Sequence, residues 1–437
     1  MVNKICIVGD VVTDVSLPQN GDDIKIRLGG ITHSARIFWS LNLNYSTKFI
    51  SPDYLEDSIL DYYKKHGSTD VSRIAIVTGA PYVFLIGSVK ETGNQLYDFI
   101  LRDQVKINLI ESELNKLNGF EDYLMVTGSF DYELILEQLY SKCHIHVDLS
   151  NSISEISELK DNRFETIFIS TSSELFLKNY NNSFSDFCNL FRDNCNVIIL
   201  KENRGGSRIF DFKTGNLYKI PSITQPIKHS VGIGDAYDAC YVSKYKELGI
   251  ENAAYLSSWI AAEYASTTYP DDLKKNIGRI LKTKIETLKL LGGCSLPWED
   301  RKSYPIYIAA PDFDYLDTSK IDELCESLNY HNFYPRRPIK ENGQLTVETK
   351  KEERHNTYQK DISLLNECKL LIVVYINEDT GTMIELGYAK ALGIPCLVYD
   401  PYNKAYNCIL TEIPLLLSSD LDKILSETFN QLSKQNE

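Results

Sequence analysis

Three carboxylates flank one apolar stretch near the end of the chain. Asp361 precedes residues 370–376, and Asp379 and Glu385 follow them. Like charges that share a small site repel one another unless a substrate, protons or cations make use of them. A nearby carboxylate can stabilise or trap the oxocarbenium-like state through which an N-glycosidic bond breaks. The three carboxylates therefore predict a site at which a substrate, protons or cations make use of the negative charge.

A buried strand and the helix after it must position these groups. Residues 370–376 form a short apolar run, typical of a parallel strand buried on both faces. Beyond Gly381, apolar residues recur at helical spacing until Gly393, and another strand follows at 396–399. This pattern predicts Glu385 in the first turn of a helix beyond the carboxyl end of a central strand, where open α/β sheets bind small molecules. The alternative is that Glu385 only complements the helix dipole.

The motifs of this region resemble those of the nucleoside 2-deoxyribosyltransferase family over roughly residues 304–415. The shared features are an opening strand at 306–311, the mid-domain Asp361 and the run Asp379-x-Gly381-Thr382-x-x-Glu385-Leu-Gly-Tyr-Ala. The resemblance implies a nucleoside, a nucleotide or a pentose as the small-molecule substrate. Whether a second base or water completes the reaction does not follow from the sequence.

The resemblance also implies roles for individual residues. Glu385 would be the nucleophile, and Asp361 and Asp379 would bind the leaving base and manage its proton. Gly381 and Thr382 would contact the substrate. Tyr307 would orient Glu385 through a phenolic hydrogen bond; a half-buried strand tyrosine is the alternative interpretation.

Two further pairs are candidates for contacts with the sugar. Arg336 and Arg337 could bind a 5′-phosphate, whereas a solvated basic turn is the more ordinary interpretation of adjacent arginines. Asn403 and Asn407 are candidates for the 5′-hydroxyl contact that the transferase family makes near its C-terminus.

A second chemical signal is the run Gly232-Ile233-Gly234-Asp235 before a predicted helix. Glycines at a helix start let backbone N–H groups point at an anion, and the helix N-terminus adds a positive partial charge. An Asp at this junction can accept a hydroxyl proton while the N–H groups hold developing negative charge, as phosphoryl transfer to an alcohol requires. An ordinary capped helix start is the alternative.

Residues from about 3 to 290 resemble the ribokinase-like (pfkB) family of sugar and nucleoside kinases. The matching positions are Gly9, Asp10, Asp14, Gly29, Gly30, Gly232, Gly234 and Asp235. The resemblance implies that Asp235 is the general base and that Asp14, Gly29 and Gly30 bind the acceptor. ATP would be the donor, with Mg²⁺ bridging its phosphates.

Several motifs of that family are altered in this chain. The anion-hole motif begins with His229-Ser230 where the family has Asp-Thr, and Ser34 replaces the Asn that follows the Gly-Gly turn. Of the family's Asn-x-x-Glu motif only Glu174 is present, and of its nucleotide loop only the last glycine, Gly205. Two interpretations follow. The similarity along residues 3–290 favours an active kinase. The altered motifs favour a nucleotide-binding sensor that regulates a nucleotide-degrading N-glycosidase. A purely structural protein is disfavoured, because an unused cluster of like charge costs stability.

The length of 437 residues exceeds one ordinary core and predicts two domains. We expect a kinase domain over 1–294, a polar linker over 295–304 and a transferase-like domain over 305–437. The predicted fold class is α/β: a ribokinase-like three-layer α/β/α domain followed by a smaller flavodoxin- or Rossmann-like parallel-sheet domain. The elements expected in the first domain include strands at 4–8, 123–126, 144–147, 166–169 and 196–200, and helices at 32–41, 235–248, 252–268 and 273–291.

Composition narrows the class of protein. The chain is 43% hydrophobic and 24% charged, with mean hydropathy -0.24 and no apolar run of membrane-spanning length. Ten scattered cysteines predict reduced, mostly buried thiols in a cytoplasmic protein without a metal site. The net charge of -14 argues against nucleic acid as a partner. We expect a homo-oligomer, because the transferase family completes its site with a neighbouring subunit.

Overall fold

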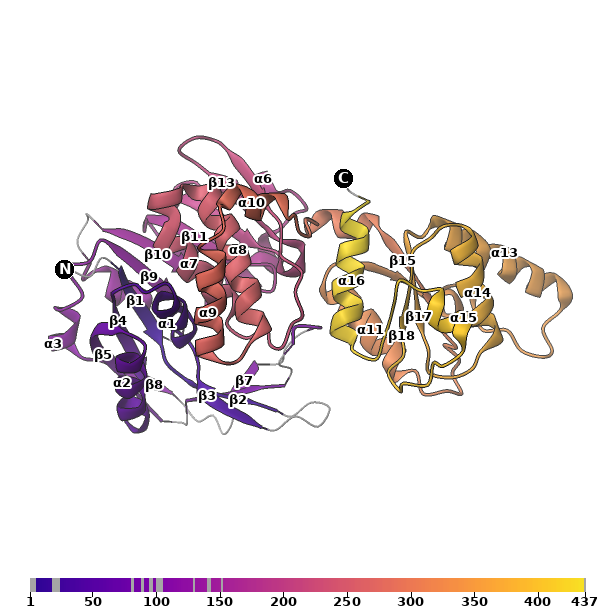
Figure 1. Cartoon of the computed structure of the whole chain (residues 1–437), viewed down its shortest axis with the longest axis horizontal. Coiled ribbons are helices and arrows are strands. Elements are labelled where there is room, and N and C mark those ends of the chain that lie inside the picture. Colours follow the sequence, from indigo (N-terminus) through magenta and orange to yellow (C-terminus); the bar gives the residue numbers. More distant parts are fainter. Residues whose placement is uncertain are drawn as a thin grey trace. The chain divides into compact units, whose positions relative to one another are not determined.

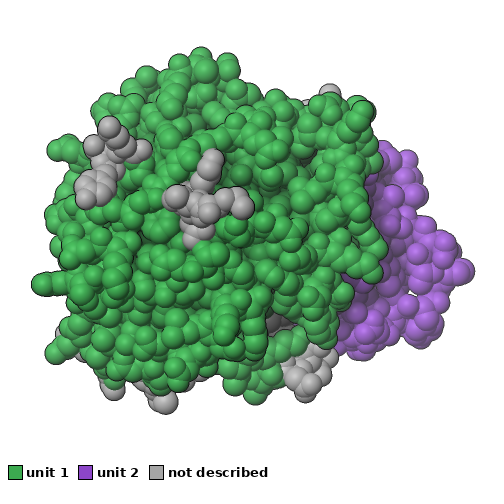
Figure 2. Space-filling model, turned by 60° about the vertical axis from the view of Figure 1, so that its left-hand side comes forward, with its two compact units in different colours: residues 1–90, 95–295 green, residues 91–94, 296–437 purple. Residues whose placement is uncertain are grey.

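A computed structural model describes residues 5–17, 24–79, 82–87, 90–93, 97–99, 105–128, 130–139, 143–150 and 152–435. The chain divides into two compact units, residues 1–90 with 95–295 and residues 91–94 with 296–437 (Figure 2). Within the described ranges, no helix is both long enough and apolar enough to pass through a bilayer. Eight of the ten cysteines are buried thiols, as the sequence predicts, and Cys143 and Cys408 are more accessible.

The first unit is built on a ten-stranded sheet with the order β14-β13-β12-β11-β10-β9-β1-β4-β5-β8 (Figure 1). The strands from β12 through β5 are parallel, and β8, β13 and β14 are antiparallel to their neighbours. The strand bounds are β1 Ile5–Asp10, β4 Tyr45–Ser51, β5 Ser68–Thr78, β8 Lys106–Leu109, β9 Asp122–Val126, β10 His144–Asp148, β11 Phe164–Ser170, β12 Cys195–Lys201, β13 Ser207–Asp211 and β14 Leu217–Ile220.

Parallel strands bring their carboxyl ends to one edge of this sheet. The last residues of β1, β10 and β12 are Asp10, Asp148 and Lys201, so three charged groups meet that edge. A second, four-stranded sheet has the order β3-β2-β6-β7. Its strands are β2 Thr13–Ser16, β3 Lys25–Leu28, β6 Val83–Ile86 and β7 Tyr97–Phe99. β2 follows β1 directly and carries Asp14 away from the main sheet.

Helices α1, α7, α8 and α9 of the first unit contact one another (Figure 1). Their apolar side chains join those of the main sheet in one core. The helix bounds are α1 Thr32–Ser40, α2 Glu56–Lys65, α3 Glu111–Leu114, α4 Tyr132–Leu136, α5 Glu174–Asn179, α6 Phe184–Asn189, α7 Ile233–Leu248, α8 Ile250–Ser266, α9 Pro270–Ile280 and α10 Ile285–Leu290.

The prediction of one helix over 273–291 is wrong. The chain forms α9 and α10, with a break at residues 281–284. Lys284 is extended there, with φ -63° and ψ 142°. The break coincides with a polar stretch, and helices in proteins depend on an apolar face that packs against the core.

The second unit contains a five-stranded, wholly parallel sheet with the order β16-β15-β17-β18-β19. Its strands are β15 Pro305–Ala309, β16 Tyr334–Arg336, β17 Leu370–Val374, β18 Cys396–Tyr399 and β19 Leu416–Ser418. Its helices are α11 Ser319–Tyr330, α12 Pro338–Asn342, α13 Lys351–Glu367, α14 Thr380–Ala391, α15 Cys408–Glu412 and α16 Leu421–Ser433. Numbered within the unit, the strand order is 2-1-3-4-5, the flavodoxin-like order. The predicted fold class, with a larger α/β unit followed by a smaller parallel-sheet unit, is confirmed.

Period-two alternation decides which side chains of this sheet face α13 and α14. Tyr307 and Ala309 of β15 lie in the same apolar cluster as Leu371 and Val373 of β17. Leu386 of α14 completes that cluster. Tyr307 therefore points to the face of the sheet that α14 covers.

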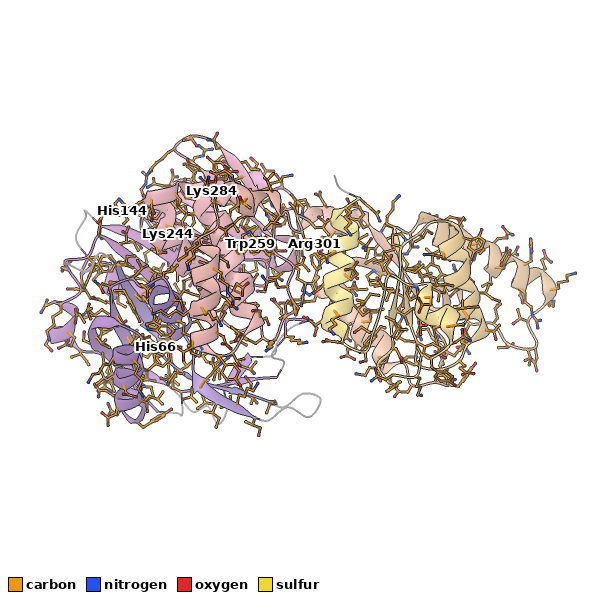
Figure 3. All side chains as sticks on the ribbon, viewed as in Figure 1. His66, His144, Lys244, Trp259, Lys284 and Arg301 are labelled. Carbon is orange, nitrogen blue, oxygen red and sulfur yellow. The ribbon has the colours of Figure 1, made fainter. Side chains whose placement is uncertain are left out.

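The stretch expected as a linker is ordered at the start of the second unit. Glu299–Ser303 forms a short 3-10 helix in which Arg301 is buried (Figure 3). The guanidinium of Arg301 donates to the carbonyl oxygens of Leu296 at 3.1 Å and His331 at 3.2 Å. It also lies 4.9 Å from the ring centre of Phe429. The domain boundaries drawn from the sequence stay a prediction.

Candidate active sites

Helix α14 starts with a side-chain cap. The Oδ2 atom of Asp379 accepts hydrogen bonds from the backbone N–H of Thr382 at 2.7 Å and from its hydroxyl at 2.8 Å. The helix consequently begins at Thr380 and includes Gly381. Glu385 thus lies in the second turn, not in the first turn as predicted, because the cap at Asp379 lets the helix begin at Thr380, before the start expected beyond Gly381.

Tyr307 holds the side chain of Glu385. Its hydroxyl donates to Glu385 Oε1 at 2.7 Å, the hydrogen bond expected from the sequence. The tyrosine ring is fully buried in the core of the second unit, so the position of its hydroxyl is fixed by packing. Burial and the neighbouring Glu385 both raise the pKa of Tyr307, which keeps the phenol protonated and able to donate.

Glu385 has an unusual acidity. Burial raises the pKa of its carboxyl from 4.5 to about 7; the hydrogen bond from Tyr307 opposes this shift, and the charges of Asp361 and Asp379 add to it. Electrostatic coupling of this kind requires proximity. The structure therefore places Asp361 and Asp379 within electrostatic reach of Glu385.

Asp361 enters this group from helix α13. Its Oδ1 accepts a hydrogen bond from the Asn342 amide at 2.7 Å. Burial raises the pKa of Asp361, and the Asn342 bond limits the shift. The sequence analysis missed Asn342, which lies at the end of α12 and has no motif around it. Its amide orients one carboxylate oxygen of Asp361 and leaves the other available.

The location agrees with the general rule for open α/β sheets. The strand order reverses between β15 and β17, and ligands bind beyond the carboxyl ends of the strands at such a point. Tyr307 comes from β15, and α14 with Glu385 follows β17. The carboxylate group thus lies at the switch point of the sheet.

The two adjacent arginines are both paired with carboxylates. Arg337 forms a bidentate pair with Asp312, with both distances 2.7 Å, and a further contact with Asp322 at 2.6 Å. Arg336 binds Glu341 through Nε and Nη2, at 2.6 to 3.0 Å. The interpretation as a solvated basic turn is therefore wrong, because Asp312 and Asp322 from other segments and Glu341 from the adjacent helix α12 pair with the two arginines. The phosphate role stays a prediction and would require these pairs to open.

The two asparagine candidates have local structural roles. Asn407 caps α15 and accepts the N–H of Ile409 at 2.9 Å. Asn403 adopts a left-handed backbone conformation, with φ 53°. Their contact with substrate stays a prediction.

In the first unit, the residue before helix α7 has a backbone conformation and a close contact that only glycine permits. Gly232 has φ 79°, and a Cβ there would lie 2.3 Å from the ring of His33. A Cβ on Gly234 would lie 3.1 Å from Lys201 Nζ. Ile233 is the first residue of the helix and Asp235 the third. The bare backbone leaves N–H groups of the helix start accessible to an anion.

Asp235 has the acidity expected of a general base. Burial and the charge of Asp148 raise the pKa of Asp235 to about 7, Lys201 opposes the shift, and Asp14 adds to it. A base titrates most usefully near the pH at which it works. Asp235 and Asp14, both predicted from the sequence, are thus electrostatically coupled.

Lys201 is a charged group that the sequence analysis missed. Its Nζ lies 2.9 Å from Asp148 Oδ2 and 2.7 Å from Asp238 Oδ2. Burial alone would lower the pKa of Lys201, but the two carboxylates raise it, so the lysine stays charged beside Gly234. The available signal was positional, because Asp148 and Lys201 each directly follow a strand predicted from the sequence.

Asp14 is buried against the Gly-Gly turn. A Cβ on Gly29 would lie 2.2 Å from Asp14 Oδ1, and one on Gly30 would lie 2.1 Å from the carbonyl oxygen of Asp10. Gly30 also has φ 61°. Both glycines are required by close approach, and they place the Asp14 carboxylate between β2 and α1. Their role in binding an acceptor stays a prediction.

Two residues predicted for the nucleotide site, Glu174 and Gly205, follow the carboxyl ends of β11 and β12, and their contact with a nucleotide stays a prediction. Glu174 starts α5, is exposed and pairs with Lys178 at 2.8 Å. In the loop after β12, the left-handed backbone belongs to Asn203, with φ 55°, and to Gly206, with φ 99°. A Cβ on Gly206 would lie 2.3 Å from a backbone oxygen. Close approach and a positive φ therefore require glycine at Gly206, and the predicted role of Gly205 in binding a nucleotide stays a prediction.

The described part of the chain holds no group of three or more His, Cys, Asp or Glu side chains arranged to bind a metal ion. The two histidines of β10 lie beside Asp122 instead. Nδ1 of His144 and Nε2 of His146 are each 3.5 Å from its Oδ1.

Comparison with known proteins gives a different relative for each unit. Residues 306–432 match the model of the family described as nucleoside 2-deoxyribosyltransferase. The N-terminal part resembles a fructokinase with bound ATP from Xylella fastidiosa, at 9% identity and a TM-score of 0.50, over 64% of this chain and 99% of that one. A ribokinase from Thermotoga maritima is 16% identical over 65% of this chain and 100% of its own, with a TM-score of 0.47. Comparison with curated proteins gives no match. The chain therefore joins a unit with the ribokinase fold to a segment, residues 306–432, that matches the nucleoside 2-deoxyribosyltransferase family model.

Proposed function

We propose that the chain is a nucleoside-metabolising enzyme with two chemistries. The second unit cleaves or transfers across the N-glycosidic bond of a nucleoside or nucleotide, with Glu385 as nucleophile. The first unit phosphorylates a hydroxyl of a sugar or nucleoside with ATP as donor. The observation that carries the glycosidic activity of the second unit is the 2.7 Å hydrogen bond from Tyr307 to Glu385 at the switch point of a parallel sheet.

The glycosidic step uses the two oxygens of Glu385 differently. Tyr307 donates to Oε1, which leaves Oε2 to attack C1′ of the sugar. The C1′–N bond breaks, an ester forms between C1′ and Glu385, and the base leaves with a proton supplied by Asp361 or Asp379. A second base or water then attacks C1′, loses its proton to the same acid and restores the Glu385 carboxylate.

Protonation states support this division of labour. Burial raises the pKa of Asp361, which favours the protonated form that a proton donor needs. Glu385 must be ionised to attack, and the bond from Tyr307 lowers the pKa that burial raises. Asp379 uses Oδ2 to cap α14, which leaves Oδ1 for the base.

The residues around the start of α7 fit a nucleotide phosphate. Gly232 and Gly234 expose the helix N-terminus, and Lys201 supplies a buried positive charge beside it. ATP would supply the phosphoryl group, with Mg²⁺ held chiefly by the phosphates. Asp235 would take the proton of the acceptor hydroxyl, because its pKa of about 7 matches that task. Asp14 would bind the acceptor.

A nucleotide sensor is the second candidate for the first unit. The observation that favours it is the carboxylate content of the site, because Asp148, Asp235 and Asp238 all lie near Lys201. Carboxylates around this lysine repel a phosphoryl group in transfer, which would leave a nucleotide bound through its base and sugar but not turned over. Binding of ATP without release of ADP would favour this candidate.

A metabolite screen tests the proposal on the full-length protein. Deoxynucleosides, nucleosides and their 5′-phosphates are incubated with and without ATP, and free base and ADP are measured by mass spectrometry. We expect base release that Glu385→Ala abolishes and ADP release that Asp235→Asn abolishes. Base release by Glu385→Ala at the wild-type rate would rule out the nucleophile, and unchanged ADP release by Asp235→Asn would rule out the general base.

A further inference from the structure

Arg27 is a partly buried cation, and two of its buried guanidinium nitrogens have no hydrogen bond. It lies opposite Asp14 in the antiparallel pair of β3 and β2. Its Nε is 3.7 Å from Asp14 Oδ2, too far for a hydrogen bond, and its side chain is 18% exposed. Its Nε and Nη2 atoms are both buried and have no hydrogen-bond partner. A guanidinium normally satisfies such donors with a carboxylate or a phosphate.

A second buried arginine lies close by. Arg36 of α1 donates to the hydroxyls of Tyr62 at 2.8 Å and Tyr264 at 3.3 Å, and has no carboxylate partner among the described residues. The same Tyr264 hydroxyl shares a hydrogen bond of 2.6 Å with His33 Nδ1. His33 Nε2 lies 3.4 Å from Asp14 Oδ2. The contacts therefore run continuously from Arg36 to Asp14, which faces Arg27.

The charges of this group do not balance. Arg27 and Arg36 are positive, and Asp14 is the one carboxylate that the contacts above include. Burial lowers the pKa of His33 to about 4, so the imidazole is neutral at physiological pH and does not alter the sum. Buried donors without partners cost free energy, and an anion that binds them recovers it.

The group also lies beside the proposed phosphoryl-transfer site. The ring of His33 packs against Gly232, at the start of α7. The charge of Asp14 acts on Asp235. A molecule bound at Asp14 and Arg27 is therefore a neighbour of the proposed general base.

We propose that Arg27 binds a phosphomonoester of the acceptor, so that the first unit acts on a pentose phosphate or a nucleoside 5′-phosphate rather than on a neutral sugar. This inference rests on the proposed kinase function of the same site. The two free nitrogens of Arg27 match the bidentate geometry with which guanidinium binds phosphate. Asp14 would bind a hydroxyl of the same molecule. Glycosidic cleavage of a nucleotide by the second unit would release a pentose phosphate, a substrate of this class.

Binding measurements on the full-length protein test the inference without relying on phosphoryl transfer. All variants carry Glu385→Ala, so that nucleotides are not cleaved. Ribose 5-phosphate is compared with ribose, a nucleoside 5′-monophosphate with its nucleoside, and inorganic phosphate is measured alone. The variant is Arg27→Met. The matched control is Arg192→Met, which removes the same charge from an exposed arginine that donates to Asn189.

We expect a phosphorylated ligand to bind about tenfold or more tightly than its neutral counterpart, and Arg27→Met to abolish that preference while Arg192→Met keeps it. Because Arg27 has unsatisfied donors, Arg27→Met should unfold at the same temperature as the parent or higher. Equal binding of phosphorylated and neutral ligands, no binding of either, or a preference that survives Arg27→Met would overturn the inference. Loss of ADP release would reject the kinase proposal alone, since ligand binding is measured separately.

Discussion

Opposing interactions act on the pKa of Glu385. Burial and two neighbouring carboxylates favour its protonated form, whereas the hydrogen bond from Tyr307 favours the ionised form. Only the ionised carboxylate can attack C1′. The rate of base release must therefore depend on pH near the pKa of about 7, well above the range of an ordinary glutamate.

The first prediction concerns this pH dependence. For base release, kcat/KM should fall about tenfold per pH unit below the pKa of Glu385. Tyr307→Phe removes a bond that lowers this pKa, so the acidic limb should move to higher pH by roughly one unit or more. Tyr358→Phe, which alters an exposed tyrosine of α13, is the control and should leave the limb in place. A Tyr307→Phe profile that overlays the wild type would contradict the role of the hydrogen bond.

Some of the candidate site residues could be predicted from the sequence, and others could not. The spacing from Asp379 to Glu385 is local, so the strand and helix around it predict their proximity. Arg27 and Lys201 were missed because their partners come from other elements. Arg27 faces Asp14 through the pairing of β3 with β2, and Lys201 at the end of β12 contacts Asp238 of α7. No local pattern encodes those contacts.

At the scale of elements, the start of α14 combines a structural and a chemical role in Asp379. Asp379→Ala should lower the free energy of unfolding by about 1 kcal/mol, because a helix cap is lost. Asp379→Ser should keep most of that stability but still reduce base release. Denaturant titration and base-release kinetics on both variants separate the roles. Wild-type activity in Asp379→Ser would show that the residue is a cap only.

The start of α7 allows a matched test with two glycines. Gly232→Ala should destabilise the protein by more than about 1 kcal/mol and abolish ADP release, because of its positive φ and the contact with His33. Gly278→Ala in α9 has open space around it and should stabilise the protein by about 0.5–1 kcal/mol. Equal stability of the two variants would contradict the proposed geometry of the anion site.

The local sequence pattern predicts which helices and strands form better than it predicts where they begin and end. The parallel strands were predictable because they are continuous apolar runs, and α7 and α14 because their apolar residues repeat at helical spacing. The start of α14 and the break between α9 and α10 depend on a capping side chain and on what the helix packs against. The 3-10 helix at Glu299–Ser303 depends on the burial of Arg301 within a polar stretch.

For the whole molecule, the two chemistries should be separable in one polypeptide. The residues proposed for each reaction come from one unit only, so Glu385→Ala should keep ADP release and Asp235→Asn should keep base release. Both rates are measured on the same full-length preparations. If either substitution abolishes both reactions in a folded protein, the units act as one catalyst, or the first unit acts as a sensor for the second. The homo-oligomer and the cytoplasmic location stay predictions.

The central claim is that Glu385 becomes covalently attached to the sugar. The direct measurement is rapid acid quench of full-length protein with excess substrate, followed by mass spectrometry of the peptide that contains Glu385. The account predicts a peptide heavier by one pentosyl group in the wild type, and its absence in Glu385→Gln. Base release at a normal rate without any such adduct, or an adduct on another residue, would contradict it.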